Sequence, residues 1–85
     1  MEVAVGKISH YFGHVGVAAF KVEAAELKVG DTIHIKGHTT DLTQTIESMQ
    51  IEHQEVAVAK PGQEIGIKVR DHVREHDVVL KVVPD

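Results

Sequence analysis

Apolar and polar residues alternate most clearly in the segment 27–37, where a turn leads directly into a strand. Gly30 and Asp31 form the turn, because glycine tolerates a positive φ and aspartate can bond back to its own backbone. Ile33 and Ile35 then alternate with polar side chains, with the period of a half-buried strand. A helix over the same residues would contain Gly30 and several β-branched side chains, which have low helix propensity, so the pattern predicts a strand.

The residues before this segment predict two strands joined by a hairpin. Residues 2–10 form the first strand, with Gly6 as a bulge that shifts the alternation by one position. Residues 11–14 are expected to connect the hairpin, and residues 15–22, rich in small side chains, form the second strand. The acidic stretch 23–26 is too short for an independent helix and is expected to be a turn.

The middle of the chain predicts a polar loop, one long strand and a tight turn. Residues 37–41 are rich in side chains that bond their own backbone, which is typical of a loop. Residues 42–53 are interpreted as a single strand whose alternation slips at a bulge around Ser48 and Met49. A short apolar stretch precedes the turn at residues 60–63, where proline presets φ and the following glycine accepts a positive φ.

The last third of the chain predicts two strands separated by a charged connection. Residues 64–70 alternate regularly, with Ile65, Ile67 and Val69 pointing inward. Residues 71–77, rich in charged side chains and histidine, are expected to connect the two strands. Residues 78–83 form the last strand, which Pro84 ends because proline has no backbone N–H to donate.

About six strands with turn signals between them, and no amphipathic helix, predict an all-β fold. We expect a closed six-stranded antiparallel barrel that comprises residues 1–85 as one domain. A barrel is preferred over an open sheet, because closure removes edges on which β-branched strands would aggregate.

The composition narrows the possible classes of protein. With 85 residues and 42% apolar residues, the chain can form one small core. It has no cysteine, which excludes disulfides and thiolate metal sites. No apolar run approaches the roughly 18 to 20 residues that cross a bilayer, and the first residues do not resemble a signal peptide. We therefore expect a cytoplasmic protein without a membrane partner.

The charge argues against DNA as a partner. Nine Lys and Arg residues against thirteen Asp and Glu residues give a net charge of −4, whereas binding to a phosphate backbone depends on a concentrated basic face. Seven histidines titrate near pH 6.5 when unperturbed, and charging all of them would change the net charge from −4 to +3. Any binding that depends on the net charge of the chain should therefore vary with pH.

Several short motifs follow one another in an order found in known proteins: 6–8 (GKI), 16–18 (GVA), 27–37 (LKVGDTIHIKG), 46–49 (IESM) and 59–67 (AKPGQEIGI). In this order they resemble the second, β-barrel domain of translation GTPases such as elongation factor Tu. Residues 43–49 (TQTIESM) and 73–79 (VREHDVV) are similar to the C-terminal barrel of collagenase-like bacterial peptidases. The chain thus resembles a translation elongation factor-like protein.

The resemblance implies a closed six-stranded barrel that, in the GTPases, contacts tRNA, the ribosome or neighbouring domains. This sequence has no Gly-x4-Gly-Lys-Ser/Thr loop, so it is not expected to bind or hydrolyse GTP. It also has no recognisable nucleophile motif and no metallopeptidase-like motif. We therefore expect no enzymatic activity and no cofactor.

Seven residues in outward or loop positions are candidates for contacting RNA or protein. A basic pair at Lys68 and Arg70 is suited to a phosphate, and Tyr11 or Phe12 to stacking on a base. The simpler interpretation is that the lysines keep the domain soluble and that the aromatic residues cap one end of the barrel. The seven candidates are Lys36, His38, Thr39, Gln50, Lys60, Lys68 and Arg70.

Histidines suggest two further sites, each with a simpler explanation. His10 and His14, like His34 and His38, are four residues apart and would suit zinc or nickel at one rim. Residues four apart in one strand lie about 13 Å from each other, so a shared ion needs ligands from different strands, and solvated histidines are the main expectation. Residues 72–77 could form an acid/base cluster or a site that binds a small anion. We expect them to be a charged turn between two strands.

These observations favour a non-catalytic module that binds RNA or protein of the translation apparatus, such as tRNA or the ribosome. The alternative is a stand-alone accessory domain that docks on a peptidase-like or other enzyme partner. A histidine-based metal binder is the third hypothesis.

Overall fold

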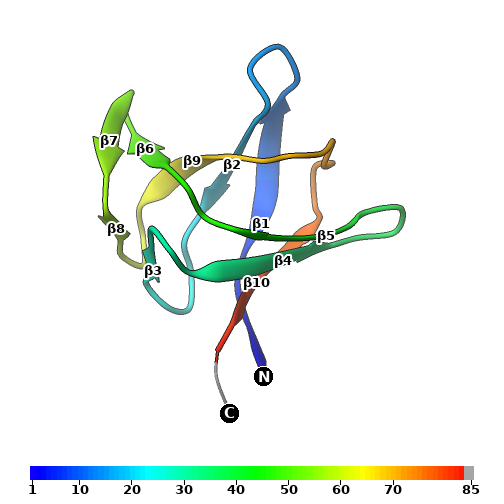
Figure 1. Ribbon diagram of the computed structural model, residues 1–85, viewed down its shortest axis with the longest axis horizontal. Coiled ribbons are helices and arrows are strands. Elements are labelled where there is room, and N and C mark those ends of the chain that lie inside the picture. The colour runs from blue at the N-terminus through cyan, green and yellow to red at the C-terminus, as the bar shows by residue number, and fades with distance from the viewer. Residues whose placement is uncertain (84–85) are drawn as a thin grey trace.

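The structure, a computed structural model, describes residues 1–83 and consists of strands and their connections (Figure 1). No helix occurs in this range, so none is long and apolar enough to cross a membrane. The all-β prediction is therefore confirmed. The strands are β1 (Glu2–Phe12), β2 (Val17–Lys21), β3 (Leu27–Lys28), β4 (Thr32–Lys36), β5 (Asp41–Thr45), β6 (Met49–Ile51), β7 (Gln54–Val56), β8 (Val58–Ala59), β9 (Glu64–Lys68) and β10 (Val78–Val82).

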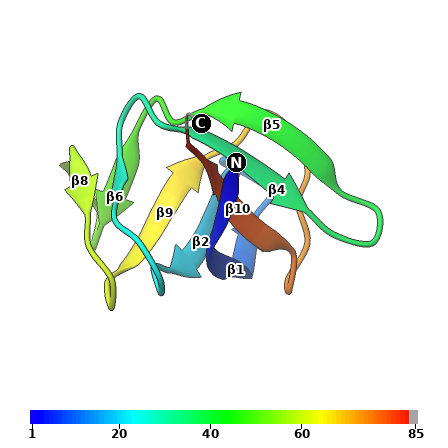
Figure 2. The same ribbon diagram turned by 90° about the horizontal axis from the view of Figure 1, so that it is seen from below.

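Eight of these strands form one antiparallel sheet in the order β5-β4-β10-β1-β2-β9-β6-β7, and β3 pairs separately with β8. Figure 2 shows how the sheet curves from β6 through β9, β2, β1 and β10 to β4 and β5. The expected closed six-stranded barrel is wrong, because the described sheet has eight strands and is open between β5 and β7. It is a half-barrel.

The open sheet arises where residues 42–53 were expected to form one strand. That prediction is also wrong, because the chain leaves β5 at Ile46 and crosses to the opposite end of the sheet, where it forms β6 and β7. Ile46 and Met49 are both buried, each with 1% of the side chain exposed. The N–H of Ile46 donates to the carbonyl of Asp31 (2.8 Å), and the N–H of Gly30 donates to the carbonyl of Ile46 (2.9 Å). These bonds hold Ile46 beside the turn that precedes β4, at the point where the chain leaves β5.

A glutamine side chain joins the end of the sheet at β5 to the end of β9. Gln44 on β5 is only 4% exposed. Its Nε2 donates to the carbonyl of Lys68 (2.8 Å), and its Oε1 accepts from the N–H of Arg70 (2.9 Å). The guanidinium of Arg70 also donates to the carbonyl of Thr43 (3.2 Å). The Gln44 amide thus provides one donor and one acceptor, as a backbone peptide group does in a ladder.

The first strand pairs with β10 along its first half and with β2 along its second half. The register with β10 shifts between Ala4 and Gly6, which confirms the predicted bulge. A Cβ on Gly6 would lie 2.5 Å from the carbonyl oxygen of Lys21 on β2, so the close approach of β1 and β2 requires glycine here. The amino group of Met1 donates to the carbonyl of Val83 (3.2 Å) and continues the contact between the first and last strands.

The turns predicted before β4 and before β9 are confirmed, and the remaining predicted strands are present with small differences at their ends. The first hairpin connection is corrected: it spans residues 13–16 and not 11–14, because β1 continues to Phe12. Gly30 (φ 99°) and Gly62 (φ 94°) adopt the positive φ that their turns require. The charged connection between β9 and β10 buries Asp77, whose carboxylate lies where a side chain on Gly37 would stand. Pro84, expected to end the last strand, lies outside the described residues.

The core is mainly aliphatic and lies on the inner face of the curved sheet, where every second residue of β2, β4 and β9 is buried. Ile65, Ile67 and Val69 point inward as predicted, with 2%, 1% and 7% of their surface exposed. The aromatic residue in the core is Phe20, at 1% exposed. Val3 on β1 is only half-buried.

Shortening Ile67 to alanine should lower the free energy of unfolding by about 2 to 5 kcal/mol, because the change leaves a cavity in a small core. Urea unfolding of Ile67→Ala measures this value. Val15→Ala, at a side chain that is 61% exposed, is the control and should change stability by no more than about 0.5 kcal/mol. Equal stability of the two variants would show that Ile67 is not a core residue.

Candidate interaction surface

The outer face of β2 and β9 has two small residues, Ala19 and Gly66, at its centre. Because Ile65 and Ile67 point inward, the residues that face outward on β9 are Glu64, Gly66 and Lys68. Gly66 is the cross-strand neighbour of Ala19 on β2 and of Gln50 on β6. Ala19 and Gly66 therefore form a low area between the longer side chains of Glu64, Lys68 and Gln50.

Two shallow depressions occupy this face, with volumes of about 300 and 690 Å³. They share Val15, Val17, Gln50 and Gly66, and we call them together the trough. The smaller depression extends toward Lys68, and the larger one extends toward Glu64. The trough therefore follows β9 from one end to the other.

One wall of the trough is the apolar connection between β1 and β2. Phe12 is 47% exposed and Val15 is 61% exposed, so both present apolar surface to solvent. The N–H of Gly16 (φ 68°) donates to the carbonyl of Phe12 (2.9 Å). The carbonyl of Gly16 in turn accepts from the N–H of Val69 (2.9 Å), which follows β9. These bonds hold the apolar wall beside the floor.

The opposite wall is the two-residue turn between β6 and β7. Glu52 and His53 both have positive φ, at 51° and 67°. Two-residue hairpin turns with two positive φ angles normally contain Asn-Gly, because other side chains are strained there. Such a conformation costs about 1 to 3 kcal/mol for each residue that is not glycine. The turn therefore places Glu52 and His53 beside the trough at the expense of stability.

The charges that line the trough are mostly negative. Glu52, Glu55 and Glu64 provide three carboxylates against the one ammonium of Lys68, a net charge of −2 when His53 is neutral. Within residues 1–83, none of these four charged side chains forms an ion pair. Glu52 and Glu64 line the larger depression, whereas Glu55 and Lys68 line the smaller one.

The structure brings only two of the seven predicted site residues together. Gln50 and Lys68 both line the smaller depression. The other five lie in three further places. Lys36 ends β4, and His38 and Thr39 follow it in the connection to β5. Lys60 lies in the turn before β9, and Arg70 follows β9. Figure 1 shows the β4–β5 connection at the right and the β6–β7 hairpin at the left, so the seven residues do not form one site.

Sequence reasoning missed the walls of the trough. Glu52 and His53 carry no turn signature, so they were included in a strand. Phe12 was considered for stacking and for capping, but not as one side of a surface shared with Val15. A usable signal was present in Ala19 and Gly66, two small residues at outward positions of neighbouring strands.

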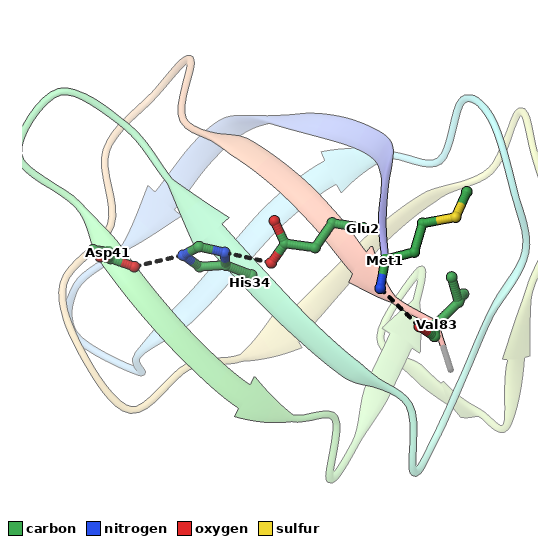
Figure 3. A network of polar contacts seen from close by, with 5 residues as sticks. All are labelled: Met1, Glu2, His34, Asp41 and Val83. Carbon is green, nitrogen blue, oxygen red and sulfur yellow. Dashed lines mark hydrogen bonds and ion pairs between the residues drawn. The ribbon is translucent and has the colours of Figure 1, made fainter. Parts of the chain in front are cut away.

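A second cluster of charged side chains lies on β1, β4 and β5 (Figure 3). His34 places Nδ1 2.7 Å from the Glu2 carboxylate and Nε2 2.5 Å from the Asp41 carboxylate. The hydrogen bond to Asp41, and then the one to Glu2, raise the pKa of His34 above its ordinary value of 6.5. Both ring nitrogens donate when the imidazole is charged, so the cluster links β4 to the adjacent β5 and, across β10, to β1.

The described residues do not support the metal hypothesis. Both nitrogens of His34 face carboxylates, and His10 lies 3.9 Å from Glu75. Among residues 1–83, no group of three or more metal-ligating side chains gathers. The segment 72–77 is a charged turn, as expected, in which the Asp77 carboxylate accepts from the N–H of Arg74 (2.8 Å).

The comparisons with known proteins show what this chain is similar to. It is 43% identical over 81 residues to a collagenase of Porphyromonas gingivalis, a match that covers 94% of this chain and 20% of the collagenase. It is 38% identical over 79 residues to an uncharacterized protease of Methanocaldococcus jannaschii, covering 92% and 19%. The chain resembles one part of larger proteins named as proteases. It spans about one fifth of the length of the curated relatives it matches.

A solved structure has the same fold. The C-terminal domain of a Geobacillus thermoleovorans protein described as a U32 peptidase superposes with a TM-score of 0.85 at 23% identity, covering 93% of this chain and 91% of that domain. No family model matches the chain. The predicted similarity to collagenase-like peptidases is confirmed, whereas the resemblance to translation GTPases receives no support from these proteins.

The raised pKa of His34 predicts how stability depends on pH. The charged imidazole stabilises the folded state fully below pH 6.5, and this contribution is lost as the pH rises through the raised pKa. Urea unfolding at pH 6 and pH 9 should therefore show a larger loss of stability for the unmodified domain than for His34→Gln. Equal losses would contradict a stabilising imidazolium.

Relieving the strained turn should stabilise the domain. In Glu52→Asn with His53→Gly, both positions accept a positive φ more readily, so the free energy of unfolding should rise by about 1 kcal/mol. Glu55→Asn changes a neighbouring exposed carboxylate on β7 that does not have a positive φ, and it should bring no gain. Thermal unfolding of both variants gives the comparison; a double variant no more stable than the control would argue against strain.

Proposed function

We propose that this chain is a non-catalytic accessory domain that docks on a peptidase-like protein. The observation that carries the proposal is the coverage: more than nine tenths of this chain matches about one fifth of each relative. The remaining four fifths of those relatives lies outside the match. A domain of the same fold, studied alone, is the C-terminal part of a protein described as a U32 peptidase.

The exposed apolar side chains beside the trough support docking as the function of this domain. Phe12 and Val15 present apolar side chains that pack against the trough and not against the core. Apolar side chains exposed beside a depression are a feature that interaction sites share. Contacts between domains of one protein, or between a domain and its partner, usually bury about 600 to 1,500 Å².

The described side chains favour binding over catalysis. His34 on β4 uses both ring nitrogens in contacts with carboxylates of β1 and β5. The buried carboxylate of Asp77 accepts a hydrogen bond within its own turn. Neither group faces the trough, and no motif for a nucleophile or a nucleotide occurs in the sequence.

An RNA partner has less support. The trough carries a net negative charge, and a phosphate backbone would be repelled by Glu52, Glu55 and Glu64. Of the seven residues predicted to bind, Gln50 and Lys68 are the two that contribute to docking in this proposal.

The test uses the P. gingivalis collagenase with its 81 matched residues removed. Purified domain and truncated collagenase are mixed and analysed by sedimentation velocity and isothermal titration calorimetry. We expect a 1:1 complex with a dissociation constant of roughly micromolar size or lower. An unrelated peptidase of similar size and charge is the control. Failure to form a complex would contradict the proposal.

A further inference from the structure

The trough combines an apolar floor and wall with two ends of different charge. Val17 and Ala19 lie on its floor beside Phe12 and Val15, so its middle favours apolar side chains. Glu52 and Glu64 stand at one end on different elements. Lys68 stands at the other end, together with Glu55.

The dimensions suit an extended chain. β9 runs from Glu64 at one end of the trough to Lys68 at the other, five residues that span about 13 Å along the strand. An extended segment of about five residues covers the same length. Its side chains alternate, so apolar residues can face the floor while the ends meet the charged groups.

The charges select among possible occupants. A second copy of this chain would bring another net charge of −2 against the first, so the same face on two copies repels itself. A nucleic acid meets the same repulsion. A basic side chain is attracted, because the carboxylates of Glu52 and Glu64 form no ion pair in the part of the chain that the structure describes; Lys21, the cross-strand neighbour of Glu64, forms none with it.

We infer that the trough binds an extended segment of the peptidase-like partner, with apolar side chains on the floor and a basic side chain between Glu52 and Glu64. This inference rests on the proposed function, because it names the surface and the chemistry of the docking. It also assigns a use to the Glu52–His53 turn, which places a carboxylate beside the trough.

The experiment reverses the charge at the acidic end. Glu52→Lys with Glu64→Lys changes the net charge of the chain from −4 to 0. The matched control, Glu23→Lys with Asp71→Lys, makes the same change at exposed positions that line neither depression. Each variant is titrated into the truncated P. gingivalis collagenase, and circular dichroism checks that it is folded.

We expect the trough variant to bind at least tenfold more weakly, and the control to bind within about twofold of the unmodified domain. Ala19→Arg, which fills the floor without changing the turn, provides a second trough variant and should also bind more weakly. Unchanged binding by the trough variants overturns this inference and leaves the proposed function standing. Absence of binding by the unmodified domain overturns both, and dimerisation or tRNA binding through the trough identifies a different occupant and overturns the inference.

Discussion

The fold depends on a side chain that acts in place of backbone pairing. The eight-stranded sheet is open between β5 and β7, yet the end at β5 must be held against the rest of the molecule. Gln44 does this with one amide, which donates to the carbonyl of Lys68 and accepts from the N–H of Arg70. Because the amide is buried, its loss would leave backbone groups without partners, at a cost of about 1 to 3 kcal/mol each.

This constraint connects the interior to the candidate surface. Gln44 holds the end of β9 from within, and the same strand presents Gly66 and Lys68 to the trough on the outside. The apolar wall is attached to the same place, since Gly16 accepts a hydrogen bond from Val69. The shape of the trough therefore depends on how β9 is held.

Sequence reasoning succeeded where one local signal decides the structure. Gly30 and Gly62 mark turns, and the alternation of Ile65 and Ile67 marks a strand, because these features depend only on adjacent residues. It failed for residues 42–53, where a slip in alternation fits a bulge as well as a change of strand. It also failed for closure and for the trough, because the contacts of Gln44 and the turn at Glu52 and His53 depend on tertiary packing.

Amide hydrogen exchange followed by NMR tests this account most directly. The N–H of Arg70 follows β9 and has no strand partner, so only the Gln44 side chain protects it in the described structure. We predict protection of the Arg70 amide comparable to that of amides within β9, and its selective loss in Gln44→Ala. Rapid exchange of that amide in the unmodified domain, or equal protection in the variant, would contradict the claim that Gln44 holds β5 against the end of β9.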